Sequence, residues 1–118
     1  MTPFVALWLR AFLLTLGVEL AVATPLLPRD APLARRLGAV TFANVASHPA
    51  VWFILPELFP SHLSMLIGVE LWAFASEVLI YRLVFSDLAW RRAIAISALA
   101  NGASVLVGLA ARAAGAPL

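Results

Sequence analysis

The chain contains no cysteine and no lysine among its 118 residues. The absence of cysteine excludes disulfide bonds, thiolate metal sites and c-type haem attachment. Charge is also scarce, because Asp, Glu, Lys and Arg make up only 12% of the residues, compared with about 25% in a typical soluble domain. With a net charge of only +2, the chain offers no basic surface of the kind that binds nucleic acid, and we expect no such partner.

The residues that are present are mostly apolar. Hydrophobic residues account for 64% of the chain, and the mean hydropathy is +1.00. This composition predicts an integral membrane protein, with a single transmembrane domain over residues 1–118. Every basic residue is arginine, and Ala, Leu, Val and Pro are abundant, which is typical of GC-rich bacteria. We therefore expect a multi-pass protein of the bacterial inner membrane, in contact with the lipid bilayer.

Four apolar segments are long enough to cross a bilayer as helices. Breaks rich in proline and polar residues separate them, and Ser61 is placed to cap the third segment. Pro49 lies inside the second segment, where it removes a backbone hydrogen bond. We predict an all-α bundle of four transmembrane helices, with spans at about residues 4–27, 37–55, 63–85 and 93–111.

The first segment ends in Ala21-Val-Ala23, which resembles the cleavage site of a secretory signal peptide. Two features argue against cleavage. Glu19 interrupts the apolar region, and the region before it carries only Arg10. We expect the segment to be retained as the first span.

Arginine placement predicts the orientation. Positively charged residues gather in the cytoplasmic loops of membrane proteins. Arginines are concentrated around the first and third connections, whereas the opposite side of the predicted bundle has only Arg10 and Arg112. The bias therefore places these two connections in the cytoplasm and both termini outside. The arginines concerned are Arg29, Arg35, Arg36, Arg82, Arg91 and Arg92.

The second half of the chain resembles the first. Ala43-Asn44-Val-Ala46-Ser47 matches Ala100-Asn101-Gly-Ala103-Ser104, and Glu19 and Glu77 precede the two asparagines by 25 and 24 residues. This register predicts two similar helix pairs in the same orientation, which is a parallel internal repeat. An alternative register matches Gly17-Val-Glu19-Leu20 with Gly68-Val-Glu70-Leu71, but it requires a gap further along the chain.

Each predicted helix carries one polar stripe on an otherwise apolar surface. A charged side chain in hydrocarbon costs roughly 3 kcal/mol on insertion scales, so these stripes are expected to face the bundle interior. Glu70 and Glu77 share one face of the third helix, since they lie close to two turns apart. The predicted intramembrane polar site consists of Glu19, Asn44, His48, Glu70, Glu77, Tyr81, Asn101 and Ser104.

Several of these residues have alternative interpretations. Asn44 and Asn101 either hold helices together by hydrogen bonds or line a pathway. His48 either lines the site or bonds a carbonyl group freed by Pro49. Glu70 either belongs to the site or is neutralised by Arg10, which lies at a level where it can reach this carboxyl group. No cofactor and no catalytic residue is predicted, because phosphate-binding and dinucleotide motifs are absent.

A metal site is a weaker hypothesis. Glu19, His48 and Glu77 together offer one nitrogen and two oxygen ligands, which suit a borderline divalent ion. No contiguous ligand motif, such as two histidines at helical spacing, supports this interpretation.

Three functional hypotheses follow. The leading one is a small transporter or channel for protons, cations or a small solute, with Glu19 and Glu77 as the exchanging groups. The alternative is an accessory or assembly subunit of a larger membrane complex, which requires a membrane-protein partner. The third is a membrane-embedded metal-binding protein or enzyme. A homo-oligomer fits any of these, since four helices enclose little volume. The small residues that favour close helix approach are Ala93, Ser97, Ala100 and Ser104.

Overall fold

The computed structural model describes all 118 residues and contains only helices. A short 3₁₀ helix, η1 (Leu55–Leu58), follows the second of four long helices. The prediction of an all-α fold is therefore confirmed at the level of helix number and class. The four long helices are α1 (Pro3–Ala23), α2 (Leu33–Phe53), α3 (His62–Val84) and α4 (Trp90–Ala113).

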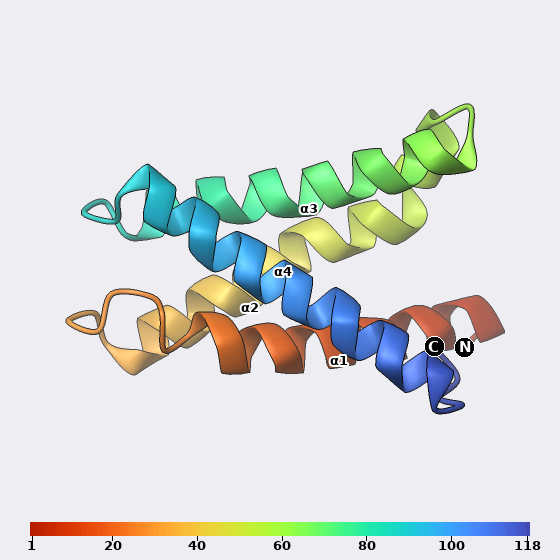
Figure 1. The fold of residues 1–118 in the computed structure, drawn as a ribbon, viewed down its shortest axis with the longest axis horizontal. Coiled ribbons are helices and arrows are strands. Elements are labelled where there is room, and N and C mark those ends of the chain that lie inside the picture. The colour runs from red at the N-terminus through yellow and green to blue at the C-terminus, as the bar shows by residue number, and fades with distance from the viewer.

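The helices run alternately up and down as a four-membered ring. Both α1 and α3 pack against α2 and against α4, whereas the diagonal pairs make no backbone contact. Figure 1 shows the α1–α2 and α3–α4 connections together at one end of the molecule. The two termini and the connection through η1 lie at the other end. We call these the loop end and the terminal end.

Three of the four helices, α1, α3 and α4, are long and apolar enough to cross a membrane. A helix of 21 residues, the length of α1, spans about 32 Å at roughly 1.5 Å per residue, which matches the hydrocarbon core of a bilayer. The α2 helix has the same length but is not among them. Every membrane-length stretch of α2 contains Arg36, Asn44 and His48, which lower its hydropathy.

The distribution of polar and apolar side chains is the reverse of that in a soluble domain, with polar groups inside and large apolar groups outside. Only 20 of the 118 residues are buried, and seven of these are polar or charged. Large apolar side chains such as Leu71, Leu83 and Leu106 are more than half exposed. A monomer in water does not expose so much contiguous apolar surface, whereas lipid is a suitable neighbour for it. The fold is therefore compatible with a membrane protein that has a polar interior.

The apolar core is concentrated at the loop end. Tyr81, Leu27 and Val40 are fully buried there, and Phe85 and Leu88 complete the contact between the two helix pairs. The four small residues of α4 are part of this interior. Ala93, Ser97 and Ala100 are completely inaccessible, and Ser104 is 8% exposed. The small-residue face therefore packs closely against the other helices of the same chain.

The chain entering α3 is fixed by local contacts. Ser61 caps the helix as predicted: its hydroxyl group accepts from the Ser64 backbone N–H at 3.1 Å, and the Ser64 hydroxyl accepts from the Ser61 N–H. The Phe59 ring lies against Gly68, at a place where any side-chain carbon would collide with it. Glycine at this position lets the connection through η1 fold back closely onto α3.

Candidate functional site

The first buried carboxyl group belongs to Glu19 of α1, which is 2% exposed. The Asn44 amide group of α2 donates to Glu19 Oε2 at 2.8 Å and also to its own helix at Val40 O. The Ser104 hydroxyl group of α4 donates to Glu19 Oε1 at 3.3 Å. Each Glu19 oxygen therefore has one donor, and the carboxyl group connects three helices.

The second buried carboxyl group belongs to Glu77 of α3, also 2% exposed. The Tyr81 hydroxyl group, one helical turn further along, donates to Glu77 Oε1 at 2.9 Å. On the other oxygen, Oε2, Glu77 accepts from the Asn101 amide group and from the Ser97 hydroxyl group, the latter at 3.4 Å. Such extensive solvation by protein donors is what a buried carboxyl group requires.

The two clusters are joined. Ser104 approaches Glu19 with its hydroxyl group and lies three residues after Asn101, which donates to Glu77. The polar stripes of all four helices thus meet at one buried point. Six of the eight residues predicted from the sequence lie in this network: Glu19, Asn44, Glu77, Tyr81, Asn101 and Ser104.

Contacts in one half of the chain have counterparts in the other half. Glu19 with Asn44 corresponds to Glu77 with Asn101.

A second pair of matching contacts lies at the loop end. Arg35 of α2 donates to the Val84 carbonyl group at 2.7 Å, and Arg92 of α4 donates to the Leu26 carbonyl group at 3.2 Å. Residues 35 and 92, like the two asparagines, are separated by 57 positions, and residues 26 and 84, like the two glutamates, by 58. One exception is Ser47, the counterpart of Ser104, which donates to Ala43 O instead of Glu77.

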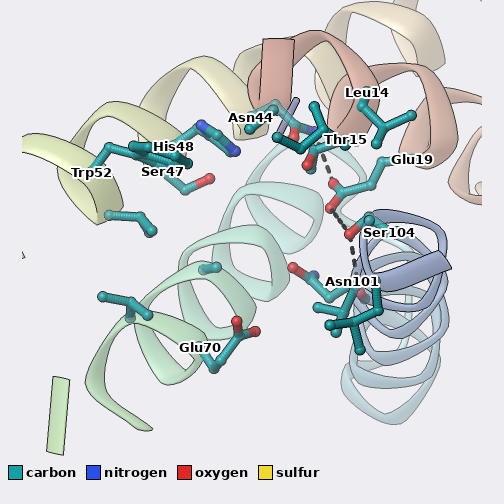
Figure 2. A pocket seen from close by; sticks show the side chains of 18 of the residues that line it. Leu14, Thr15, Glu19, Asn44, Ser47, His48, Trp52, Glu70, Asn101 and Ser104 are labelled. Carbon is teal, nitrogen blue, oxygen red and sulfur yellow. Dashed lines mark hydrogen bonds between the residues drawn. The ribbon is translucent and has the colours of Figure 1, made fainter. Parts of the chain in front are cut away.

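A pocket of about 360 Å³ lies above this network, towards the terminal end. Figure 2 shows Glu19, Asn44, Asn101 and Ser104 gathered at one side of it, with His48 and Trp52 on α2 and Glu70 on α3. The lining extends to Arg112 and Leu118 near the C-terminus. Glu77 and Tyr81 do not line the pocket. The pocket therefore reaches down as far as Glu19, and the apolar core closes the bundle beyond it.

His48 lines the pocket but stands apart from the carboxyl network. Its Nδ1 accepts a hydrogen bond from the Trp8 indole N–H at 3.1 Å, so Nε2 is the nitrogen that carries the proton in a neutral ring. The ring also packs edge-on against Phe12 and parallel to Trp52. Trp8 rather than a carbonyl group freed by Pro49 is therefore the partner of His48.

Glu70 also lines the pocket, where its side chain is exposed and makes no hydrogen bond. The alternative in which Arg10 neutralises Glu70 is not realised in the structure. The Arg10 guanidinium group instead approaches the Pro117 carbonyl group at 3.5 Å, because the C-terminal tail folds over this part of α1. Glu70 thus remains a carboxyl group without a partner on the pocket wall.

The three weak metal candidates, Glu19, His48 and Glu77, are not gathered into a ligand group, and no set of three acidic or histidine side chains in the chain is placed to hold a metal ion. The imidazole Nδ1 is engaged with Trp8, and Glu77 lies outside the pocket that His48 lines.

Three residues of the site were not in the set predicted from the sequence: Ser97, Trp52 and Arg112. Ser97 donates to Glu77 and stands one turn before Asn101, so the polar stripe of α4 did mark it. Trp52 and Arg112 at the pocket mouth carried no such signal, since each lies at a helix end where aromatic and basic residues commonly face the membrane surface.

Comparison with protein-family models, curated proteins and solved structures finds no match to this chain. The fold and the site therefore define its class by themselves. It is a small helical bundle with an apolar exterior, two buried and hydrogen-bonded glutamates, and a pocket at one end.

Proposed function

We propose that the protein is a small membrane transporter or channel for protons, cations or a small solute, and that the pocket above Glu19 is its binding site. The observation that carries this proposal is the pocket of about 360 Å³, whose deepest polar group is a buried carboxyl. An ionisable residue within a membrane-spanning helix is expensive, and it marks a pathway more often than a packing contact.

In this proposal all four long helices cross the bilayer. The polar residues that lower the hydropathy of α2 either face the bundle interior, as Asn44 does, or lie at its first turns, as Arg35 and Arg36 do. The arginine-rich loop end is cytoplasmic under the positive-inside rule. Both termini and the pocket mouth are then on the outer side of the bacterial inner membrane.

The proposal also includes a parallel internal repeat. The paired contacts of Glu19 with Asn44 and of Glu77 with Asn101 support the register that matches these residues. The exchanged arginine contacts to Val84 and Leu26 support it independently. The two halves are then related by an axis along the membrane normal, and the carboxyl groups lie where the halves meet.

The two glutamates act together in this account. They lie in one hydrogen-bonded network, because Asn101 donates to Glu77 and Ser104, one turn further along α4, donates to Glu19. Glu19 faces the pocket and exchanges with its contents, whereas Glu77 is held by three donors behind it. The packed loop end leaves no open path through the bundle, which favours a transporter cycle or a gated channel over an open pore.

Flux through liposomes tests the proposal. The purified protein is reconstituted, gradients of H⁺, Na⁺ or K⁺ are imposed, and internal pH and ion content are followed. We expect Glu19→Gln and Glu77→Gln to reduce flux on the order of tenfold or more, a loss of at least about 1.4 kcal/mol. The matched control is Glu57→Gln, at an exposed glutamate of η1, which should leave flux unchanged. Ion flux through the wild type that both glutamate variants retain in full would contradict the proposal.

A further inference from the structure

The asparagine and serine donors at the pocket floor are already occupied. The Asn44 amide group donates to Glu19 and to Val40 O, and the Asn101 amide group donates to Glu77 and to Ser97. Ser104 donates to Glu19 and to Asn101 O. The oxygen atoms of both asparagine side chains accept nothing. What the floor retains for a ligand is therefore mainly acceptor capacity.

The charges around the pocket favour a cation. Glu19 lies at the floor and Glu70 on the wall, where no hydrogen bond or ion pair engages it. Arg112, the only arginine in the lining, is at the terminal end, close to the C-terminal residue Leu118. A ligand held between Glu19 and Glu70 would meet carboxyl groups and amide oxygens on the deep side.

The remaining wall is apolar and aromatic. Half of the lining residues are hydrophobic. The Trp52 ring lies parallel to that of His48, with centroids 6.3 Å apart, and His48 is itself fixed by Trp8. A volume of about 360 Å³ is far larger than a single dehydrated ion needs, and it is at the lower end of the range for small-molecule pockets, roughly 300–1,000 Å³.

We propose that this pocket binds a small organic monocation, with an ammonium group that donates to Glu19, Glu70 and an asparagine oxygen and a short apolar body that lies against Trp52 and the neighbouring aliphatic side chains. The inference rests on the proposed function and names its ligand class. An ammonium ion supplies the donors that the floor lacks, and the aromatic wall adds an attraction for cations.

Three probes of similar shape test the charge requirement. Benzylammonium, benzyl alcohol and benzoate share one ring and differ in the charge of the polar group. Isothermal titration of the purified full-length protein in detergent should show benzylammonium binding on the order of tenfold more tightly than benzyl alcohol and no binding of benzoate. Injecting NaCl should give no heat of binding, and NaCl should not displace bound benzylammonium. Benzoate or benzyl alcohol binding as tightly as benzylammonium, or sodium displacing it stoichiometrically, would overturn the inference.

A variant assigns the binding to the pocket. Glu70→Gln should weaken benzylammonium binding roughly fivefold to tenfold, and it leaves the buried network untouched because Glu70 makes no contact with it. Glu57→Gln is the matched control and should bind as wild type. Unchanged affinity in Glu70→Gln would overturn the inference. Ion flux that depends on Glu19 without benzylammonium binding would overturn the ligand class alone and leave the proposed function standing.

Discussion

Replacing Asn44 with leucine is expected to lower the free energy of unfolding by about 1–3 kcal/mol or more, because a buried charged or polar group loses its donor. Asn44 supplies the only side-chain donor to Glu19 Oε2. The equivalent Asn101→Leu variant should cost less, since Ser97 still donates to the affected oxygen of Glu77. Equilibrium unfolding in mixed micelles, followed by tryptophan fluorescence, measures both values.

A double variant provides the control. Replacing both partners of a buried hydrogen bond by apolar residues is often nearly neutral. We therefore expect Glu19→Leu combined with Asn44→Leu to be less destabilised than Asn44→Leu alone, since Ser104 retains its bond to Asn101 O. Additive losses in the double variant would mean that the two side chains contribute independently, contrary to the structure.

The second large effect is expected from larger side chains in the packed core of the bundle. Ala43 on α2 and Ala100 on α4 are completely inaccessible. Leucine at either position adds volume to a filled core, which costs about 1–3 kcal/mol and occasionally more. We expect similar losses for Ala43→Leu and Ala100→Leu, because the two sites correspond in the proposed repeat.

Exposed alanines of the same helices serve as controls for this series. Ala46→Leu and Ala98→Leu make the same chemical change on the outer surface, where lipid or detergent can accommodate it. These variants should unfold within about 0.5 kcal/mol of wild type, as surface substitutions usually do. Equal losses at buried and exposed sites would contradict the packing described here, and a large difference between Ala43 and Ala100 would contradict the repeat.

The helices and the central network were largely predictable from local patterns. The apolar segments gave all four helices to within a few residues at most ends, although α1 ends before residue 27 and α2 begins before residue 37. Pro28 and Pro32 break the chain early, and Arg35 and Arg36 fit in the first turns of α2. The polar stripes placed Glu19, Asn44, Glu77 and Asn101 on inward faces, where the structure brings each glutamate to its asparagine.

Other features depended on tertiary structure, which the stripes do not encode. The expected depths in the bilayer put Arg10 and Glu70 within reach of each other. In the structure the C-terminal tail instead provides Pro117 as the contact of Arg10. The small residues of α4 correctly predicted that another helix packs closely against it. They do not determine which helix does so, because this depends on the ring arrangement, in which α1 and α3 of the same chain are its neighbours. The pocket arises because the bundle is tightly packed at the loop end only, a property of no single helix.

Thiol accessibility from each side of the membrane tests the central claim most directly. The natural chain has no cysteine, so single cysteines can be introduced at Gly108 in the pocket lining, at Ile96 in the core and at Asp87 in the α3–α4 connection. A side chain at Gly108 meets nothing within 4 Å.

A membrane-impermeant maleimide, which reacts with accessible thiol groups, is applied to intact cells and to inverted vesicles. We predict that Gly108→Cys reacts in intact cells, that Asp87→Cys reacts only in inverted vesicles, and that Ile96→Cys reacts in neither. Reaction of Gly108→Cys only from the cytoplasmic side, or of Ile96→Cys from either side, would contradict an outward-open pocket closed at the loop end.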